Sequence, residues 1–363
     1  MANITSIATA VPDYCHRQKD ILQFMQQAYN LNATDRRKLA FMYHYSGIDN
    51  RYSVLKDFSL PPQQWQFINI ESNEYAPLDK RMELYKQHAL PLSLKAAQKC
   101  LAKLDNAVTV THLITVSCTG MSAPGLDLEL VEALQLSPNV FRTSVNFMGC
   151  YAGVHALKLG NMICDSCAKA NVLIVATELC TLHFQQEYTL DNAASSLLFA
   201  DGSAAILMSN NADAQPIASI NNFHSAIAFK GGKDMAWEIS SKGFLMTLSG
   251  YVPQLIEEDI TALVEEALQK SNLSKDAIHY WCIHPGGRKI VDTIQKQLGL
   301  NNGDTQPCRE VLRQYGNMSS ATIFFVLDEI CRQAKQEQKK SSSALGVAFG
   351  PGLTMETFTA HIA

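Results

Sequence analysis

Short apolar runs of strand length alternate with longer segments of helical spacing along most of the chain. In the first half this pattern predicts strands at 108–117, 142–147 and 172–178, separated by helices at 125–136 and 154–168. Apolar runs bounded by turn residues are typical of buried strands, whereas apolar residues three and four positions apart indicate a helix. The alternation therefore predicts an α/β protein.

The alternation resumes after a polar stretch at 210–216, which we interpret as the boundary between two halves, 1–210 and 217–363. The second half again combines strand-like and helical patterns, as expected if the two halves arose by duplication. We predict strands at 217–229, 277–283, 344–349 and 353–362, and helices at 252–269, 288–300 and 318–335. A Gly-Pro-Gly turn at 350–352 separates the last two strands.

Composition and charge exclude several classes of function. Hydrophobic residues make up 47% of the chain and charged residues only 18%, below the roughly 25% usual for globular proteins, so a large core is expected. The net charge of -4 comes without a block of like charges, which argues against a nucleic-acid partner. No window approaches the 18 or more apolar residues of a membrane-spanning helix.

The first residues and the cysteines favour a cytoplasmic protein. The apolar start lacks a basic region and is interrupted at Pro12 and Asp13, so it predicts a first strand and not a signal peptide. The ten cysteines are therefore expected to be reduced thiols. Cys164 and Cys167 form one CxxC pair without nearby histidines, which makes a zinc site improbable. We expect no metal and no cofactor.

Cys150 is the strongest candidate for a nucleophile. It follows a predicted strand and precedes a predicted helix, between Gly149 and Gly153, and the glycines allow a tight turn. A cysteine at a helix N-terminus is expected to have a lowered pKa, because the helix dipole favours the thiolate. The alternative is an inert buried cysteine, which is common.

His284 and Asn317 are candidate partners for this thiol. His284 ends a predicted buried strand and precedes a glycine-rich turn, a position from which a side chain can reach a cleft. Asn317 follows Gly316 and precedes an apolar helix. Its amide could donate to an oxyanion or enolate, cap the helix, or do both.

Five motifs together resemble those of type III polyketide synthases, the chalcone-synthase-like family of the thiolase superfamily, over essentially the whole chain. The resemblance implies a five-layered αβαβα fold built from two similar halves that meet at the active site, and a homodimer. The motifs are Gly149-Cys150-Tyr-Ala-Gly153, Leu198-Phe199-Ala-Asp-Gly202, His284-Pro-Gly-Gly287, Gly316-Asn317-Met-Ser-Ser320 and Phe349-Gly350-Pro351-Gly-Leu-Thr-Met-Glu-Thr357.

By this resemblance Cys150, His284 and Asn317 form a catalytic triad, and Phe199 is a gatekeeper. Cys150 would take an acyl group from an acyl-CoA starter, and His284 and Asn317 would stabilise the enolate left by decarboxylation of malonyl-CoA. The expected activity is iterative condensation, followed by cyclisation to a pyrone or resorcinol-type product. Lys38 is the one convincing match to the basic residues of the family that bind CoA.

The expected pocket departs from that of the plant enzymes and resembles bacterial members that make alkylpyrones or alkylresorcinols. Met246, close to Trp237, occupies the second gatekeeper position, which is usually aromatic. The other expected pocket residues are Cys118, Ala123, Cys180, His183, Gly350 and Pro351. The small side chains among them would leave room for a long acyl chain, or else belong to ordinary core packing, and His183 could equally be a buried, satisfied histidine.

Two other functions remain open at this level. A β-ketoacyl synthase III shares the fold and the Cys-His-Asn triad but condenses once and uses an acyl-carrier protein. Its histidine is ordinarily followed by Gln-Ala-Asn, whereas Pro285, Gly286 and Gly287 follow here. A non-catalytic thiolase-like protein is opposed by the intact residue types of the triad.

Overall fold

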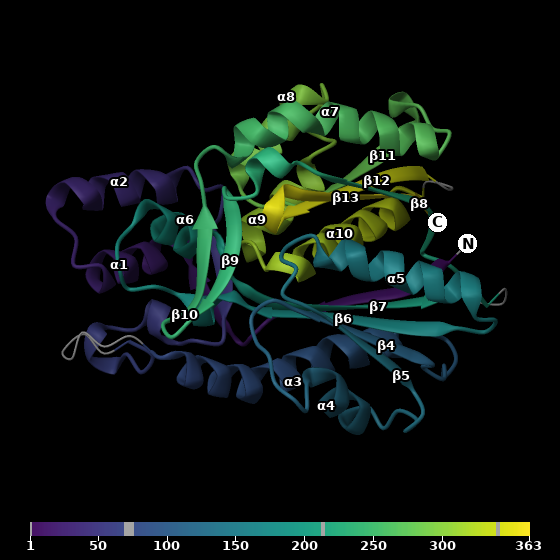
Figure 1. Cartoon of the computed structure of the whole chain (residues 1–363), viewed down its shortest axis with the longest axis horizontal. Helices are drawn as coiled ribbons and strands as arrows, with labels where there is room; N and C mark the ends of the chain where they lie inside the picture. The colour runs from purple at the N-terminus through teal and green to yellow at the C-terminus, as the bar shows by residue number, and fades with distance from the viewer. Residues whose placement is uncertain (1, 69–75, 212–214, 339–341) are drawn as a thin grey trace.

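Nine strands form one hydrogen-bonded sheet. It has two parts, here called arms, which are joined by only two residue pairs between β1 and β8. The computed structural model describes residues 2–68, 76–211, 215–338 and 342–363. The strand order is β11-β12-β13-β8-β1-β7-β6-β4-β5. Between β1 (Asn3–Ala10) and β8 (Ala218–Ile227), Asn3 pairs with Ser219 and Ile4 with Ala218, and beyond that point the two arms separate (Figure 1).

The first arm combines parallel and antiparallel strands. Its remaining strands are β4 (His112–Ser117), β5 (Phe141–Asn146), β6 (Asn171–Leu179) and β7 (Asp201–Ser209). β6 is buried at every position after Asn171, as expected for a strand covered on both faces by helices. The outer cover consists of α3 (Leu78–Ala102), against β1, β6 and β7, and α4 (Leu126–Ala133) beside it.

The second arm contains β8, β11 (Ile278–Ile283), β12 (Ser342–Gly350) and β13 (Thr354–Ile362). Its outer face is covered by α7 (Val252–Lys270), against β8 and β13, and by α8 (Arg288–Gln297) beside α7. α8 buries Ile290, Val291 and Ile294, which share one side of the helix because they are three or four residues apart. α9 (Gln306–Tyr315) packs between α8 and α10.

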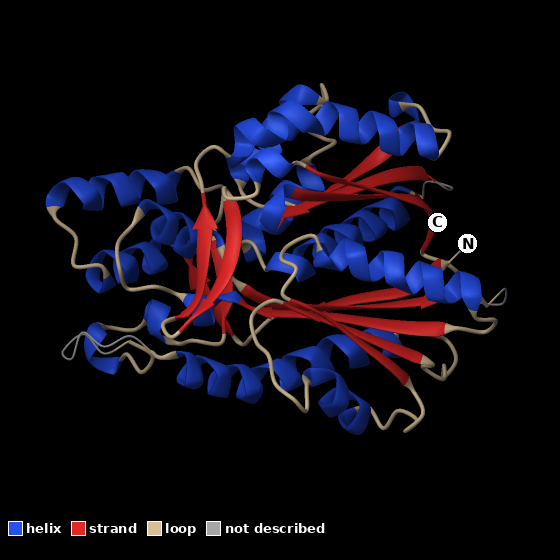
Figure 2. Cartoon of the chain, in the orientation of Figure 1, coloured by secondary structure: helices blue, strands red, loops and turns tan. Residues whose placement is uncertain are grey.

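Two helices fill the space between the arms (Figure 2). α5 (Ala152–Ser166) contacts β6 and β13, and α10 (Thr322–Glu337) contacts β1, β7 and β11. The first turns of α10 are buried on all sides, which fits a helix enclosed by two sheets. The order helix, sheet, helix, sheet, helix confirms the predicted five-layered fold.

A smaller group of elements covers one end of the layers. It contains α1 (Gln18–Ala28), α2 (Ala33–His44), α6 (Leu190–Leu198) and two short antiparallel pairs, β2 (Tyr14–Arg17) with β3 (Asn50–Ser53) and β9 (Met235–Ser240) with β10 (Gly243–Leu248). The carboxyl ends of β4, β5, β6, β11 and β12 point toward this end, so the residues that follow them converge there.

Most predicted elements are present within a few residues, and the differences have physical causes. The helix predicted at 318–335 begins at Thr322, because residues 319–321 form a separate 3-10 turn in which Ser319 has a φ of 46°. The strand predicted at 108–117 begins at His112. The proposed boundary at 210–216 includes residues 212–214, which lie outside the described residues.

Candidate active site

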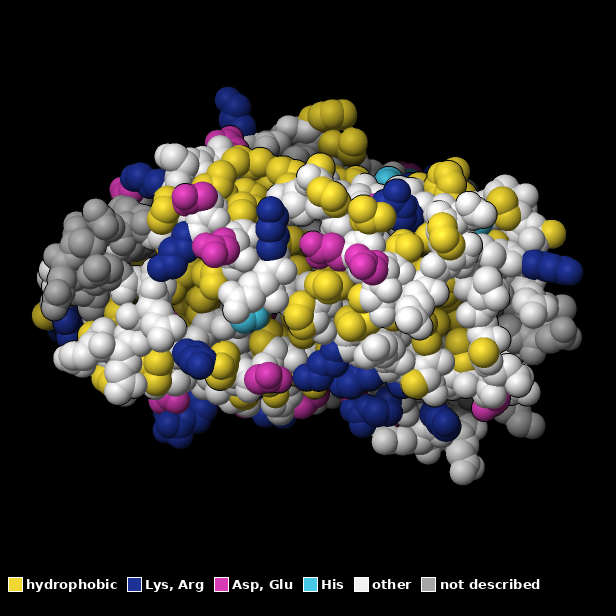
Figure 3. Space-filling view, turned by 90° about the horizontal axis from the view of Figure 1, so that it is seen from below, with side chains coloured by type: hydrophobic (Ala, Val, Ile, Leu, Met, Phe, Trp, Pro, Cys, Tyr) yellow, Lys and Arg dark blue, Asp and Glu magenta, His cyan; other side chains and the backbone are white. Residues whose placement is uncertain are grey.

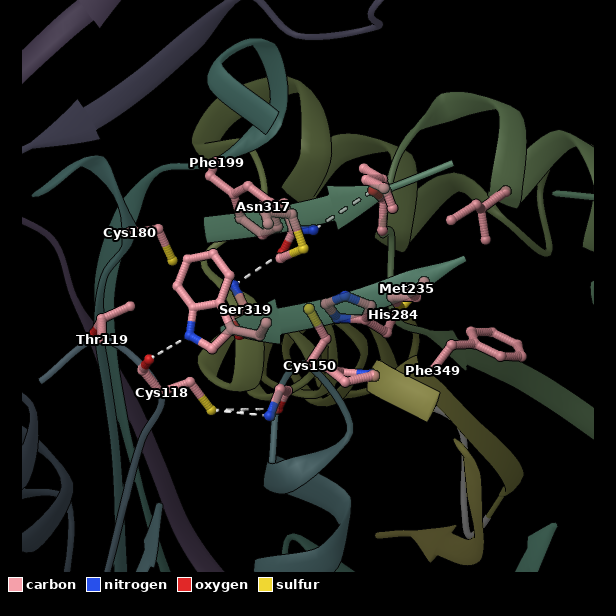
Figure 4. A pocket seen from close by; sticks show the side chains of 17 residues that line it. Cys118, Thr119, Cys150, Cys180, Phe199, Met235, His284, Asn317, Ser319 and Phe349 are labelled. Atoms are coloured by element: carbon pink, nitrogen blue, oxygen red, sulfur yellow. Dashed lines mark hydrogen bonds between the residues drawn. The ribbon is translucent and has the colours of Figure 1, made fainter. Parts of the chain in front are cut away.

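The converging strand ends enclose an apolar cavity. Cys150, His284, Asn317 and Phe199 all line it, together with Cys118, Cys180, Met246 and Pro351 (Figure 4). The structure therefore brings together most of the residues that the sequence singled out. The β9–β10 hairpin contributes Met235, Trp237, Met246 and Leu248 to the cavity wall.

Cys150 lies in the turn between β5 and α5, and neighbouring glycines make that turn possible. Gly149 has a φ of 87°, and a Cβ placed there would lie 2.1 Å from Pro351 Cδ. A Cβ at Gly350 would lie 2.5 Å from Tyr151 Cδ1 and 3.2 Å from the Cys150 nitrogen. Glycine is therefore required at both positions, and Gly350 shapes the turn from beneath without lining the cavity.

The expected lowering of the Cys150 pKa is wrong. Burial raises the pKa of this thiol to about 12, although hydrogen bonds with Ser319 and Asn317 act in the opposite direction. Removing water penalises the thiolate more than these contacts stabilise it. Cys150 is therefore a protonated thiol before substrate enters.

His284 follows β11, and its backbone nitrogen donates to Val347 O at 2.8 Å. The ring is buried, and neither ring nitrogen has a hydrogen-bond partner among the described residues. Burial lowers the pKa of His284 to about 3, so the imidazole is neutral. A buried imidazole with two unused nitrogens is available to a substrate or to the Cys150 proton.

Asn317 is held by its backbone from both sides. Its N–H donates to Leu198 O at 2.9 Å, and its carbonyl accepts from Ala200 N at 2.9 Å. In the side chain, Oδ1 accepts from Ser319 N at 2.8 Å, and Nδ2 makes a long contact of 3.5 Å to Gly286 O. Asn317 thus caps the short 3-10 turn, as one alternative expected, while its amide donor remains at the cavity.

The expected pocket residues separate into those at the cavity and those elsewhere. Cys118 lines the cavity, accepts from Gly149 N through Sγ at 2.9 Å, and accepts from Trp237 Nε1 through its carbonyl at 2.8 Å. Cys180 and Met246 also line it. Ala123 does not: it is exposed and lies in a separate surface hollow with Met121. Its expected place in the cavity wall is wrong within this chain, because the chain after β4 turns outward.

His183 and Lys38 also lie outside the main cavity. His183 Nε2 bonds to Thr119 O at 2.8 Å, Nδ1 accepts from Phe244 N at 3.2 Å, and its ring stacks on Phe244 with centroids 4.2 Å apart. It is thus a satisfied buried histidine. Lys38 is exposed on α2 and bonds to Asp35 at 3.2 Å.

Two polar residues beside the cavity were missed by sequence reasoning. Ser319 lines the cavity and hydrogen-bonds with Cys150. Glu178 is fully buried behind Cys118, where it accepts from Cys118 N and Thr119 Oγ1, each at 2.9 Å, and from Ser320 Oγ. Burial raises the pKa of Glu178 to about 7. A carboxylate within the otherwise apolar run 172–179 was the available signal.

A second cavity adjoins the first. Cys180, Phe199, Trp237 and Met246 line both cavities and so form the wall between them. The second cavity continues past an apolar group of side chains and past polar ones. The apolar group is Met25, Phe58, Phe184 and Phe244, and the polar residues include Arg51, Gln185 and Asn192.

Two further findings limit what the protein contains. Within the described ranges, no group of three or more His, Cys, Asp or Glu side chains could hold a metal ion. A helix long and apolar enough to cross a membrane is likewise missing from the residues that the structure covers.

The five layers and the thiol-containing cavity between the two arms define an acyltransferase of the thiolase-like class. The family model for the N-terminal domain of chalcone and stilbene synthases matches residues 1–212, and the model for their C-terminal domain matches residues 224–363. The chain therefore belongs to the chalcone and stilbene synthase family, whose members are type III polyketide synthases that catalyse decarboxylative condensation.

Two solved structures are similar over the whole chain. One is the polyketide synthase PKS-I from the brown alga Ectocarpus siliculosus, with 27% identity and a TM-score of 0.93, covering 100% of this chain and 98% of that chain. The other is the C-terminal type III polyketide synthase domain of Steely1, a type I/III hybrid from Dictyostelium, with 25% identity and a TM-score of 0.90, covering 100% and 99%.

Proposed function

We propose that this protein condenses malonyl-CoA onto an acyl-CoA starter that is bound as a thioester to Cys150. The observation that carries the proposal is the shared cavity of Cys150, His284 and Asn317, in which the buried His284 ring keeps both nitrogens free. A thiol, a neutral base and an amide donor are the groups that such a reaction requires.

In the loading step, His284 takes the proton of Cys150 as the sulfur attacks the acyl carbon. The bond from that carbon to the CoA sulfur breaks, and the CoA thiolate leaves with the proton from His284. A neutral imidazole can accept a proton, but with a pKa of about 3, against about 12 for Cys150, it does so only as the new sulfur–carbon bond forms. Its burial confines the proton transfer to the cavity.

In the extension step, malonyl-CoA loses CO₂ and becomes an enolate. His284 and the Nδ2 group of Asn317 donate to the enolate oxygen. The enolate carbon then attacks the Cys150 thioester, a carbon–carbon bond forms, and the Cys150 sulfur is released. The apolar wall favours loss of CO₂ because it replaces the water around the malonyl carboxylate.

Mass spectrometry of the intact protein tests the loading step. Incubation with an acyl-CoA should add one acyl group on the peptide that contains Cys150, and Cys150→Ala should abolish both the adduct and condensation. Cys118→Ala, which removes another thiol of the same cavity, should still be acylated. An adduct found only on Cys118 or Cys180 would refute the assignment.

Loss of malonyl-CoA decarboxylation tests the extension step. Asn317→Ala should slow decarboxylation by a factor on the order of 10² to 10³, the usual effect of removing one such donor. If the variant decarboxylates malonyl-CoA at the parent rate, Asn317 is only the cap of the 3-10 turn.

We further propose a long-chain starter, with cyclisation to a pyrone or resorcinol-type product. The second cavity supports this, because small or flexible side chains, Cys180 and Met246, contribute to the wall between it and the reaction cavity. Each buried methylene contributes roughly 0.8 kcal/mol, so a chain extending past Cys180 would be strongly favoured over acetyl.

Substitution at Cys180 tests the chain-length preference. Cys180→Phe should reduce turnover of a long-chain acyl-CoA far more than that of a short one, while the nearly isosteric Cys180→Ser should keep the parent profile. An unchanged profile in Cys180→Phe, or a parent preference for short starters, would contradict the proposal.

We also propose a cytoplasmic homodimer in which Lys38 contacts CoA phosphates. All ten cysteines are free thiols, as expected in a reducing compartment. Phe141 on the edge strand β5 and Met121 and Leu128 near α4 are exposed, and Figure 3 shows hydrophobic side chains between charged ones on the face seen from below. Light scattering tests the homodimer and should give twice the chain mass.

The contact of Lys38 with CoA is tested separately. Lys38→Met should raise KM for malonyl-CoA.

A further inference from the structure

Arg51 of β3 is a buried charge that takes no part in the proposed chemical steps, although it lines the second cavity. Its side chain is only 3% exposed, and it forms no ion pair with any carboxylate of the described residues. Nη1 donates to Ser196 O at 2.7 Å and Phe199 O at 2.6 Å, and Nε donates to Gln18 Oε1 at 2.9 Å. A buried charge is costly unless it is fully hydrogen-bonded, so this position calls for an explanation.

The bonds of Arg51 complete the carboxyl end of α6. The carbonyls of Ser196 and Phe199 accept from Arg51. Gln18 Nε2 donates to Leu197 O at 3.0 Å, and Leu198 O accepts from the backbone of Asn317. Four successive carbonyls at a helix end, which otherwise lack partners, are therefore all satisfied. A positive charge at this end also interacts favourably with the helix dipole.

Arg51 also packs directly beneath the peptide that leads into Asn317. A Cβ at Gly316 would lie 2.9 Å from both Cγ and Cδ of Arg51 and 3.0 Å from Leu198 O. Phe199 and Asn317, which both line the reaction cavity, are thus placed against one side chain that does not line it.

We propose that Arg51 is a positioning residue that fixes Asn317 and Phe199 in register with each other. The planar guanidinium bonds two carbonyls of the Phe199 segment while its stem supports the Gly316–Asn317 turn. The inference rests on the proposed role of Asn317 in decarboxylation. A lysine at this position would keep the charge but not the fixed geometry of several donors.

The test compares two reactions of the same variant, each measured per folded enzyme. Arg51→Lys should lower malonyl-CoA decarboxylation, which needs the Asn317 amide, at least tenfold. Alkylation of Cys150 by iodoacetamide should stay within twofold of the parent rate. A merely structural role would lower the melting temperature and leave the decarboxylation rate per folded enzyme unchanged, and that result would overturn the proposal.

Arg81 provides a matched control, because it is also a buried arginine held by backbone carbonyls, those of Ala76, Leu182 and Phe184. Arg81→Lys should lose stability but keep decarboxylation within twofold. If Arg51→Lys does not fold, Gln18→Met provides a second test, because it removes the hydrogen bonds of Gln18 to Arg51 and to Leu197 O. This variant should decarboxylate malonyl-CoA several-fold more slowly. Decarboxylation by Gln18→Met at the parent rate would overturn the proposal. Asn317→Ala at the parent rate would instead refute the proposed function itself.

Discussion

Burial sets the protonation state of the side chains around the reaction cavity. Cys150 and Glu178 are held protonated more strongly than in water, with pKa values of about 12 and about 7, and His284 is held neutral with a pKa of about 3. At neutral pH Cys150 and His284 are therefore uncharged, whereas Glu178 is partly ionised. Further charge is expected to develop only when substrate supplies a carboxylate or an enolate.

Glu178 gives a prediction about stability and pH. Its pKa is raised from 4.5 to about 7 in the folded protein, so folding binds a proton between these values and stability falls as pH rises through that window. Glu178→Gln has no such loss. We compare the free energy of unfolding of Glu178→Gln with that of the parent. The variant should gain stability over the parent between pH 4 and pH 8, by an amount on the order of 3 kcal/mol. Denaturant titrations at both pH values check this, and a difference independent of pH would contradict it.

The turn before Cys150 gives a prediction about backbone geometry. Gly149→Ala would place a Cβ against Pro351 at a left-handed φ, so we expect a loss of about 2 to 4 kcal/mol from strain and overpacking together with loss of Cys150 acylation. Gly250→Ala is the control, because nothing lies within 4 Å of its added Cβ. Thermal denaturation of both variants measures the contrast; equal melting temperatures would be inconsistent with a strained turn.

At the scale of elements, the β9–β10 hairpin closes the reaction cavity without belonging to the large sheet. Hydrogen bonds from Trp237 Nε1 to Cys118 O and from Phe244 N to His183 Nδ1 attach its strands to the rest of the chain. At its turn, Ser241 O accepts from Leu78 N and Lys242 O accepts from Gln185 Nε2. Several of its other residues, including Ile239 and Leu245, are exposed. A two-stranded element of this kind has little independent stability.

We therefore predict faster amide hydrogen exchange in the hairpin than in β4 and β6. Trp237→Phe removes the bond to Cys118 O and should accelerate exchange over 235–248 by several-fold while leaving β6 unchanged, because a hydrogen bond of this kind contributes about 1 kcal/mol. Trp65→Phe, which removes a similar bond to Leu60 O outside the hairpin, serves as control. Equal exchange in the two variants would show that Trp237 does not hold the hairpin.

At the scale of the whole molecule, buried histidines and buried carboxyls act on stability in opposite directions. The pKa values of His183 and His284 are lowered to about 3. As pH falls below 6.5 these histidines become protonated in the unfolded chain but not in the folded one, so the free energy of unfolding decreases. The pKa values of Glu178 and Asp201 are raised to about 7 and about 6, so stability increases as pH falls until both are protonated in the unfolded chain as well. The two effects partly cancel between pH 6.5 and 4.5.

Below about pH 4.5 the histidine effect is joined by Glu310 and Glu356, whose pKa values are lowered by their hydrogen-bond and charge partners, so we predict a steep loss of stability there. His183 and His284 should each contribute about 1.4 kcal/mol per pH unit. His183→Gln, which keeps one donor and one acceptor and does not titrate, should reduce the slope by about that amount. Melting temperatures from pH 3.5 to 8 provide the measurement, and an unchanged slope in His183→Gln would exclude its part in acid unfolding.

The sequence by itself determined the α/β alternation and the three residues at the centre of the cavity, whereas the five layers were implied by the family resemblance. Strand and helix periodicities are local, and glycines beside Cys150, His284 and Asn317 mark turns at strand and helix ends, so both signals can be found without knowing which segments meet. The same local view is wrong at Asp201 and Gly202, because an Asp-Gly pair by itself predicts a turn. Both residues begin β7, and Asp201 is buried, accepting from Val54 N and Thr181 N.

Only the tertiary structure decided how these residues are used. Burial raises the pKa of Cys150, and the outward turn after β4 removes Ala123 from the cavity. The second cavity and the hydrogen bonds of Arg51 likewise join segments more than a hundred residues apart. Desolvation, cavity shape and the partners of a buried charge depend on contacts between distant segments, and local patterns of hydrophobic and polar residues do not contain those contacts.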